Sequence, residues 1–176
     1  MSDTLITVVA ILLAAILMFL FPLLSVSERS DDVSQLAVQT AVNEFVDSSA
    51  TVWKITMHNY NKLVSTLNAT GNPYDVQIEH KILDENIGKK TAWTQGTVIG
   101  ENVYYSVYTS QIMSEIEGEP NGLYKMKKGD ILSVNVQNSG KTLAQMIRGV
   151  FYSISEKGNY QIEAQHSRVV TATASE

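Results

Sequence analysis

An almost unbroken apolar run opens the chain, and beyond it polar and apolar residues alternate in shorter patterns. The segment from Leu5 to Val26 carries no charge, and fourteen of its first twenty residues are Leu, Ile, Val or Phe. As a helix this segment would be about 33 Å long at roughly 1.5 Å per residue, close to the hydrocarbon thickness of a bilayer. A buried helix of a soluble protein would show a polar stripe instead. The pattern therefore predicts a transmembrane helix over residues 5–26, preceded by a short flank of residues 1–4.

A cleavable signal peptide is the alternative interpretation of this run. Signal peptides begin with basic residues and have apolar stretches of about 7–15 residues, whereas this chain begins Met1-Ser2-Asp3 and its run is longer. An anchor that stays in the protein is therefore expected. Its orientation is left open, because Arg29 is the one basic residue near the run and only nominally favours a cytoplasmic C-terminus.

One face of the predicted transmembrane helix carries small residues. Ala10 and Ala14 are four positions apart, so a second helix could approach closely along that face. Pro22 lies near the end of the run, where a missing backbone hydrogen bond is tolerated. The residues predicted to anchor the chain and to pack against other helices are Leu5, Ala10, Leu13, Ala14, Leu17, Phe21 and Pro22.

A helical pattern continues beyond the run without a flexible linker. Val38, Val42 and Phe45 recur at helical spacing, so the helix is expected to extend out of the bilayer as an amphipathic helix. Two aspartates after Ser30 would also suit a new helix that starts there, which is the alternative.

A second helix is predicted between Thr56 and Gly71. Thr56 can cap its first turn, and Ile55 with Tyr60 can pack around that cap as a hydrophobic staple. The sequence Gly71-Asn72-Pro73 ends the helix. Residues 27–71 are therefore predicted to form a helical stalk followed by this second helix.

Beyond Pro73 the period of the pattern changes from 3.6 to 2, which is typical of strands with one buried face. The predicted strands cover residues 74–82, 103–107 and 160–166, and residues 84–101 are expected to form a loop or an irregular hairpin. Residues 123–127 and 131–136 are predicted to pair with each other as a hairpin closed around Lys128-Gly129-Asp130.

Two short helices interrupt these strands. One is predicted to begin at Thr109 as its N-cap, and the other covers residues 143–150. The second is amphipathic, with an apolar face formed by Leu143, Met146, Ile147 and Val150. The predicted fold class is α+β. A transmembrane helix extended by an amphipathic helix precedes a head domain of residues 72–176, an antiparallel sheet of four or five strands packed with helices.

Composition and charge narrow the function classes. The net charge of −5 argues against a nucleic-acid binder that relies on a basic surface, so no nucleic-acid partner is expected. The absence of cysteine excludes disulfides, thiolate metal sites and cysteine catalysis.

No cluster of residues predicts catalysis. His80 and His166 occupy the apolar register of predicted strands and could share a metal ion. No third ligand accompanies them, so satisfied, half-buried histidines are the favoured interpretation. Gly140-Lys141-Thr142 resembles the end of a phosphate-binding loop, but Asn135 stands where that motif requires glycine. The chain is therefore predicted to be no enzyme and to hold no cofactor and no metal.

Tyrosines give the predicted strand at residues 103–107 apolar area on both faces. Tyr104 and Tyr108 point away from the face that carries Tyr105 and Val107. A central strand covered on both faces is the favoured interpretation, and a contact with a partner subunit is the alternative. The candidate subunit contacts are Val38, Val42, Phe45, Tyr104 and Tyr108.

The order of these features, an apolar N-terminal helix that continues into a small α+β head, resembles type IV pilins and the pseudopilins of Tad pili. Several stretches are similar to pilin-like proteins of Gram-positive Tad-type gene clusters. They are Phe21-Pro22, Phe45-Val46-Asp47, Ile55-Thr56-Met57 through Tyr60, Leu67 to Asn72 with Tyr74-Asp75-Val76, residues 124–130, and the segment from Thr142 to Tyr152.

The resemblance implies a membrane-anchored structural subunit of a pilus or secretion filament, whose apolar helices bundle and whose heads lie outside. The implied partners are the lipid bilayer and other pilin-like subunits or further copies of the chain. The implied location is the cell membrane, with a single pass and an extracellular head. Pilins typically carry a basic leader and a Glu five residues into the mature helix, whereas Asp3 is the one acid here. An unprocessed accessory or minor subunit is therefore expected, and a membrane-tethered extracellular binding or adhesion module is the alternative.

Overall fold

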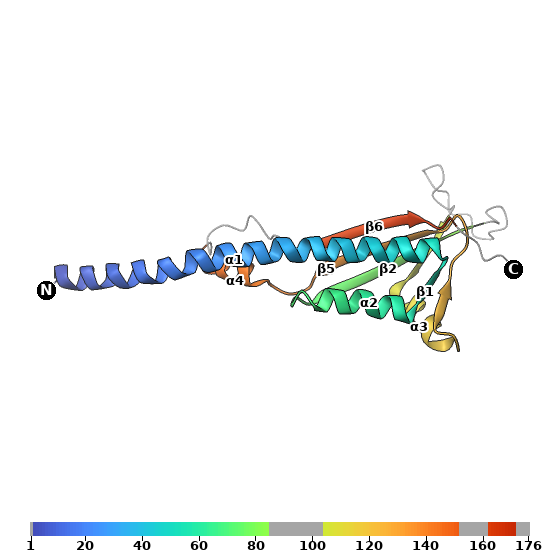
Figure 1. Ribbon diagram of the computed structural model, residues 1–176, viewed down its shortest axis with the longest axis horizontal. Helices are drawn as coiled ribbons and strands as arrows, with labels where there is room; N and C mark the ends of the chain where they lie inside the picture. The colour runs from blue at the N-terminus through green and yellow to red at the C-terminus, as the bar shows by residue number, and fades with distance from the viewer. Residues whose placement is uncertain (1, 85–103, 152–161, 172–176) are drawn as a thin grey trace, which may run out of the picture.

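The computed structural model describes residues 2–84, 104–151 and 162–171. Its largest element is the helix α1 (Ser2–Thr51), whose 50 residues form one continuous rod. At roughly 1.5 Å per residue this rod is about 75 Å long. The helix passes through Pro22 and Ser30 without interruption, so the alternative of a new helix starting near Ser30 is wrong. In Figure 1 the N-terminal half of α1 projects alone, and its C-terminal half lies along the head.

The described part of the head is built on a four-stranded antiparallel sheet. Its strands are β2 (Tyr74–Leu83), β3 (Tyr104–Tyr108), β5 (Ile131–Asn138) and β6 (Glu163–Val169), in the order β3-β2-β5-β6. The C-terminal half of α1 packs across one face of this sheet, beside β5 and β6 (Figure 1). The predicted α+β fold with an antiparallel sheet of about four strands is therefore confirmed. The loop or hairpin expected at residues 84–101 lies, beyond Asp84, outside the described residues.

A second, two-stranded sheet joins segments that are far apart in the sequence. β1 (Lys54–Thr56) pairs with β4 (Leu123–Lys125), and Ile55 lies opposite Tyr124. The prediction that residues 123–127 form a hairpin with residues 131–136 is wrong, because β5 pairs with β2 and β6. A turn does exist there, and Gly129 adopts a φ of 95° that favours glycine. It leads the chain from one sheet into the other.

Three shorter helices lie in the described part of the chain, α2 (Met57–Asn68), α3 (Thr109–Gly118) and α4 (Leu143–Phe151). Thr56 caps α2 as predicted, since its hydroxyl accepts a hydrogen bond from the Asn59 N–H at 3.1 Å. The prediction that Thr109 caps α3 is wrong, because the N-cap is Tyr108. The Thr109 hydroxyl instead bonds to the backbone N–H and C=O of Ile78, which ties α3 to β2.

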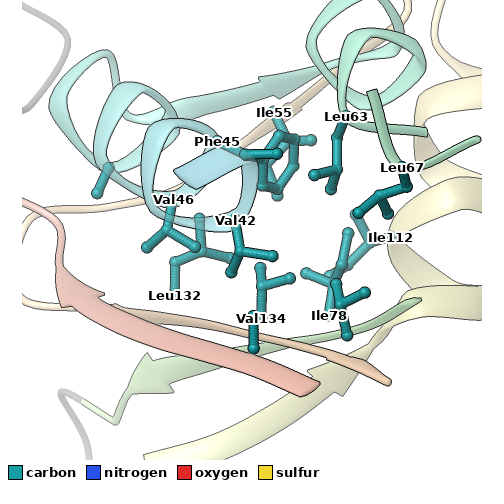
Figure 2. Packing of buried hydrophobic residues seen from close by; sticks show 14 of the residues in the cluster. Val42, Phe45, Val46, Ile55, Leu63, Leu67, Ile78, Ile112, Leu132 and Val134 are labelled. Atoms are coloured by element: carbon teal, nitrogen blue, oxygen red, sulfur yellow. The ribbon is translucent and has the colours of Figure 1, made fainter. Parts of the chain in front are cut away.

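The hydrophobic core lies between α1, α2 and the sheet (Figure 2). On α1, Val38 and Val42 are fully buried and Phe45 is 4% exposed. The core residues that they join include Leu63 and Leu67 of α2, Ile112 of α3, and Ile78, Leu132 and Val134 of the sheet. The prediction that Val38, Val42 and Phe45 contact another subunit is therefore wrong, because the head of the same chain covers this stripe.

Candidate functional site

The N-terminal half of α1 is an exposed apolar surface. No side chain between Asp3 and Val26 is buried, and Leu5, Leu13 and Phe21 are 67%, 56% and 62% exposed. Of the other predicted anchor residues, Ala10, Ala14 and Pro22 are exposed and Leu17 is half-buried. This segment is long and apolar enough to cross a membrane. Soluble monomers rarely expose so large a contiguous apolar area, so the surface is consistent with a membrane anchor.

A set of polar contacts, which we call the junction, lies directly after the apolar run and consists of Glu28, Asp31, Thr142 and Arg148. The Arg148 guanidinium donates to Glu28 Oε1 from Nε at 3.0 Å and from Nη2 at 2.5 Å. The Thr142 hydroxyl donates to Asp31 Oδ2 at 2.6 Å. Thr142 also begins α4, because its hydroxyl accepts from the Gln145 N–H. The junction therefore holds α4 against α1 where α1 leaves the head.

The two sides of α4 differ in their surroundings. Ala144 and Ile147 are buried, and α4 packs against α1. Leu143 and Met146 are each 51% exposed. The predicted apolar face of this helix is therefore divided, since Ile147 points inward while Leu143 and Met146 face away from the protein.

A buried polar network lies where the four-stranded sheet meets β4. His80, Tyr124 and Asp130 are 1%, 3% and 2% exposed. The Tyr124 hydroxyl donates to His80 Nδ1 at 2.7 Å, and His80 Nε2–H donates to Asp130 Oδ2 at 3.0 Å. Asp130 also accepts from the backbone N–H groups of Leu83 and Lys127. A neutral imidazole therefore satisfies both of its neighbours.

The chemistry of this network is structural. Burial lowers the pKa of the His80 imidazole, and the Asp130 carboxylate opposes only part of that effect. Burial also raises the pKa of the Tyr124 hydroxyl. The order Tyr–His–Asp resembles an activated nucleophile with its base and carboxylate, but the hydroxyl is enclosed in the core and bonded there. The network links the two sheets.

A second carboxylate joins α1 to β6. Asp47 accepts hydrogen bonds from Arg168 Nη1 at 2.8 Å and from His166 Nε2 at 3.1 Å. These bonds, the one from Arg168 foremost, lower the pKa of the Asp47 carboxyl. His166 and His80 share a face of the sheet, but β5 lies between their strands and each is bonded to its own carboxylate. No metal-binding group of three or more His, Asp or Glu side chains exists within the described residues.

Tyr104 and Tyr108 lie on β3, at one edge of the described sheet, and are 37% and 57% exposed. The expectation of a central strand covered on both faces is therefore wrong, and the two tyrosines stay candidates for a subunit contact. A shallow hollow of about 670 Å³ lies beside Tyr108 on the sheet face opposite α1. Its polar lining includes Asp75, Gln77, Glu79, Ser133, Asn135 and Gln165. Asn135 Oδ1 has no hydrogen-bond partner among the described residues.

Sequence reasoning misses the junction and both carboxylate networks. Glu28 and Arg148 are ordinary surface charges by their local sequence, and their spacing does not reveal that they meet. Asp130 looks like a turn residue. The usable signals are His80 and His166, polar residues in the apolar register of strands, which indicate hydrogen-bond partners on the covered face.

Comparisons with protein-family models, with curated proteins and with solved structures find no match to this chain. Its own geometry defines it as an α+β head on one long helix, whose N-terminal half is apolar enough to span a bilayer.

Proposed function

We propose that the protein is a non-enzymatic structural subunit of a pilus-like or secretion filament, anchored in the membrane by the N-terminal half of α1. The observation that carries this proposal is the division of a single helix. Residues 5–26 are apolar and none of their side chains is buried, while the stripe from Val38 to Ala50 forms part of the head's core. A simple tether needs no such continuity, since a flexible linker would serve equally well. A rod sets the distance and rotation of the head relative to its anchor, as repeated packing of identical subunits requires.

Packing between anchors supports the same function. Lipid tails are as apolar as the side chains, so association of helices in lipid depends on close van der Waals contact. Ala10 and Ala14 are exposed on one face of α1, where the backbone of a second helix can approach. The exposed Tyr104 and Tyr108 offer a second contact, between heads. The partners of this subunit are the bilayer and further copies of itself or of similar subunits.

The resemblance to type IV and Tad pilins favours a filament with extracellular heads over other membrane assemblies. Protease treatment of intact cells tests this location. Digestion of the head, with the anchor left in the membrane fraction, is the expected result. A head that is digested only after the cells are opened contradicts the proposed location.

Single-cysteine crosslinking of the full chain in membranes tests the assembly, because the natural sequence has no cysteine. Ala14→Cys is expected to form disulfide-linked dimers under mild oxidation, because the small-residue face brings anchors together. Ile16→Cys is the matched control, since position 16 lies about 200° around the helix from position 14 at 100° per residue. Strictly monomeric chains at position 14, with cysteines that still react with a small thiol reagent, contradict the proposal.

A membrane-tethered binding module is the second candidate, and the hollow beside Tyr108 favours it. Its polar lining and the unpartnered Asn135 carbonyl could accept hydrogen bonds from a ligand. Replacing residues 5–26 by an unrelated apolar helix separates the two functions. If the protein is a filament subunit, the exchanged variant no longer assembles, whether or not a ligand is present. Attachment of cells to a surface survives the exchange, and fails in Asn135→Ala, if the head is a binding module.

A further inference from the structure

The position of α4 along α1 gives this short helix a specific environment. The junction pairs α4 with Glu28 and Asp31, which are two and five residues beyond Val26, the last residue of the apolar run. At roughly 1.5 Å per residue, these points lie about 3 Å and 8 Å beyond the end of the run along the helix axis. The headgroup layer occupies about the first 5–7 Å outside the hydrocarbon core on each side of a bilayer. When residues 5–26 span the bilayer, the Arg148 end of α4 therefore lies within the headgroup layer and its Thr142 end lies at the outer edge of that layer. Figure 1 shows α4 beside α1.

The composition of α4 suits this depth. Leu143 and Met146 are three positions apart on the exposed side of the helix, and each is 51% exposed. On the neighbouring side, about 100° around the helix at 100° per residue, Ala144 and Ile147 are buried, so Leu143 and Met146 form the exposed part of the apolar face. Lys141, two residues before α4 begins, is exposed and can reach lipid phosphates. An amphipathic helix with apolar residues on one face and flanking basic residues is typical of the membrane interface.

The two carboxylates of the junction do not oppose this placement. The Glu28 carboxylate accepts two hydrogen bonds from Arg148, and Asp31 accepts one from Thr142. Their charge is directed into the junction. The polar contacts of α4 are thus on its protein side, and its lipid-facing side offers apolar surface.

We propose that α4 is an interfacial helix, which places Leu143 and Met146 among the lipid headgroups. In this way α4 makes a second contact with the bilayer beside the transmembrane anchor, and it fixes how closely the head sits on the membrane. This inference rests on the proposed anchoring of α1 and adds a lipid-binding surface to it.

Site-directed fluorescence on the full-length chain tests the inference. Met146→Cys and, as a second variant, Leu143→Cys are labelled with the environment-sensitive dye NBD and reconstituted into phosphatidylcholine–phosphatidylglycerol vesicles. The vesicles carry spin-labelled lipids that quench either at the headgroup or deep in the acyl chains. Two reference positions frame the result. Phe19→Cys, 79% exposed in the apolar run, reports the anchor, and His58→Cys, at an exposed position on α2, reports water.

The expected result is a blue shift of the dye emission and a loss of intensity with the shallow quencher at positions 143 and 146. The deep quencher should act mainly at position 19, and neither quencher should act at position 58. Quenching at position 19 without quenching at 143 or 146 overturns the interfacial helix and leaves the anchor intact. Absence of quenching at position 19 overturns the anchor and the interfacial helix together.

A second copy of the chain, instead of lipid, is the alternative partner of the exposed face of α4. Lowering the protein-to-lipid ratio distinguishes these two partners. Lipid quenching at position 146 that is independent of the protein-to-lipid ratio supports the interfacial helix. Protection of position 146 from aqueous iodide only at high protein density, without lipid quenching, assigns the face to a neighbouring subunit and overturns the proposal.

Discussion

The two halves of α1 share one backbone but bury their apolar side chains in different ways. In the N-terminal half Leu13 and Phe19 are 56% and 79% exposed, and apolar residues surround the helix axis. In the C-terminal half Val42 and Phe45 are buried on one stripe, and Glu44 faces outward. The comparison teaches that the distribution of apolar residues around a helix, more than their number, decides which surroundings it needs. The N-terminal half leaves its apolar side chains exposed, and the C-terminal half buries its stripe against the head.

The largest expected effect is a loss of stability when a buried residue of the C-terminal half of α1 is truncated. Phe45→Ala removes a buried ring from the core and should lower the free energy of unfolding by about 3–5 kcal/mol. Leu36→Ala is the matched control on the same helix, where the side chain is 69% exposed, and it should change stability by less than about 0.5 kcal/mol. Denaturant unfolding of both variants in detergent micelles measures the difference. Equal effects would mean that α1 is not part of the head's core.

A charge placed in the N-terminal half should reduce retention in the membrane without changing the stability of the head. Leu13→Arg adds about 3 kcal/mol to the cost of membrane insertion on the biological scale, because a charge then lies at the centre of the span. The head should unfold as in the wild type, since residue 13 does not contact it. Carbonate extraction of membranes measures retention, and unfolding of the same variant in micelles measures the head. Leu13→Ile is the conservative control. A variant that loses head stability together with retention would contradict the separation of the halves.

Acid should weaken the head while the anchor is unaffected. The pKa of His80 in the folded protein lies below the ordinary value of 6.5, so the unfolded chain binds the proton more readily. This contribution to stability is present above pH 6.5 and is lost as the pH falls through the lower, folded value. For one proton, the free energy of unfolding cannot change by more than about 1.4 kcal/mol per pH unit.

His80→Gln should flatten the pH dependence of unfolding just below pH 6.5, whatever its effect on absolute stability. His58→Gln, at an exposed position, serves as the control and should keep the slope. Asp47 has a lowered pKa from an ordinary value of 3.8, so its contribution is lost in a separate, more acidic window. A slope that persists in His80→Gln and disappears in His58→Gln would reverse the assignment.

The smallest expected effect concerns the junction between the two halves. Glu28→Gln weakens an ion pair whose side chains are 39% and 31% exposed, so solvent screens it. The expected loss of stability is about 1 kcal/mol or less and shrinks at high salt. Glu44→Gln is the control, because its pair with Lys62 is about 60% exposed on both sides and should contribute even less. Thermal unfolding of both variants at two salt concentrations makes the measurement.

Local patterns predict most of the helices and strands of the described head. The cap at Thr56, the alternation from Tyr74 onward and the stripe at Val42 depend on short-range spacing, and each is found where it is predicted. The subunit contact assigned to the stripe is wrong for a clear reason. Periodicity shows that a face is apolar, but it does not show whether the same chain or another one covers it.

Long-range pairing is what the sequence does not reveal. The turn at Gly129 suggests a local hairpin, yet Asp130 turns inward to His80, and β4 pairs with β1 nearly seventy residues earlier. The candidate site is predictable in part. The apolar run identifies the exposed half of α1, whereas the junction depends on Glu28 meeting Arg148 across 120 positions.

The continuity of α1 has a mechanical consequence. A pulling force applied at the N-terminal end travels along the rod directly into the centre of the head, since no hinge within α1 absorbs it. β6 lies alongside the C-terminal half of α1 and is bonded to it through Asp47. Withdrawal of the rod along its axis would therefore load these contacts in shear, so that many must break together. Because α1 and β6 run side by side, the head resists extraction of the helix under tension.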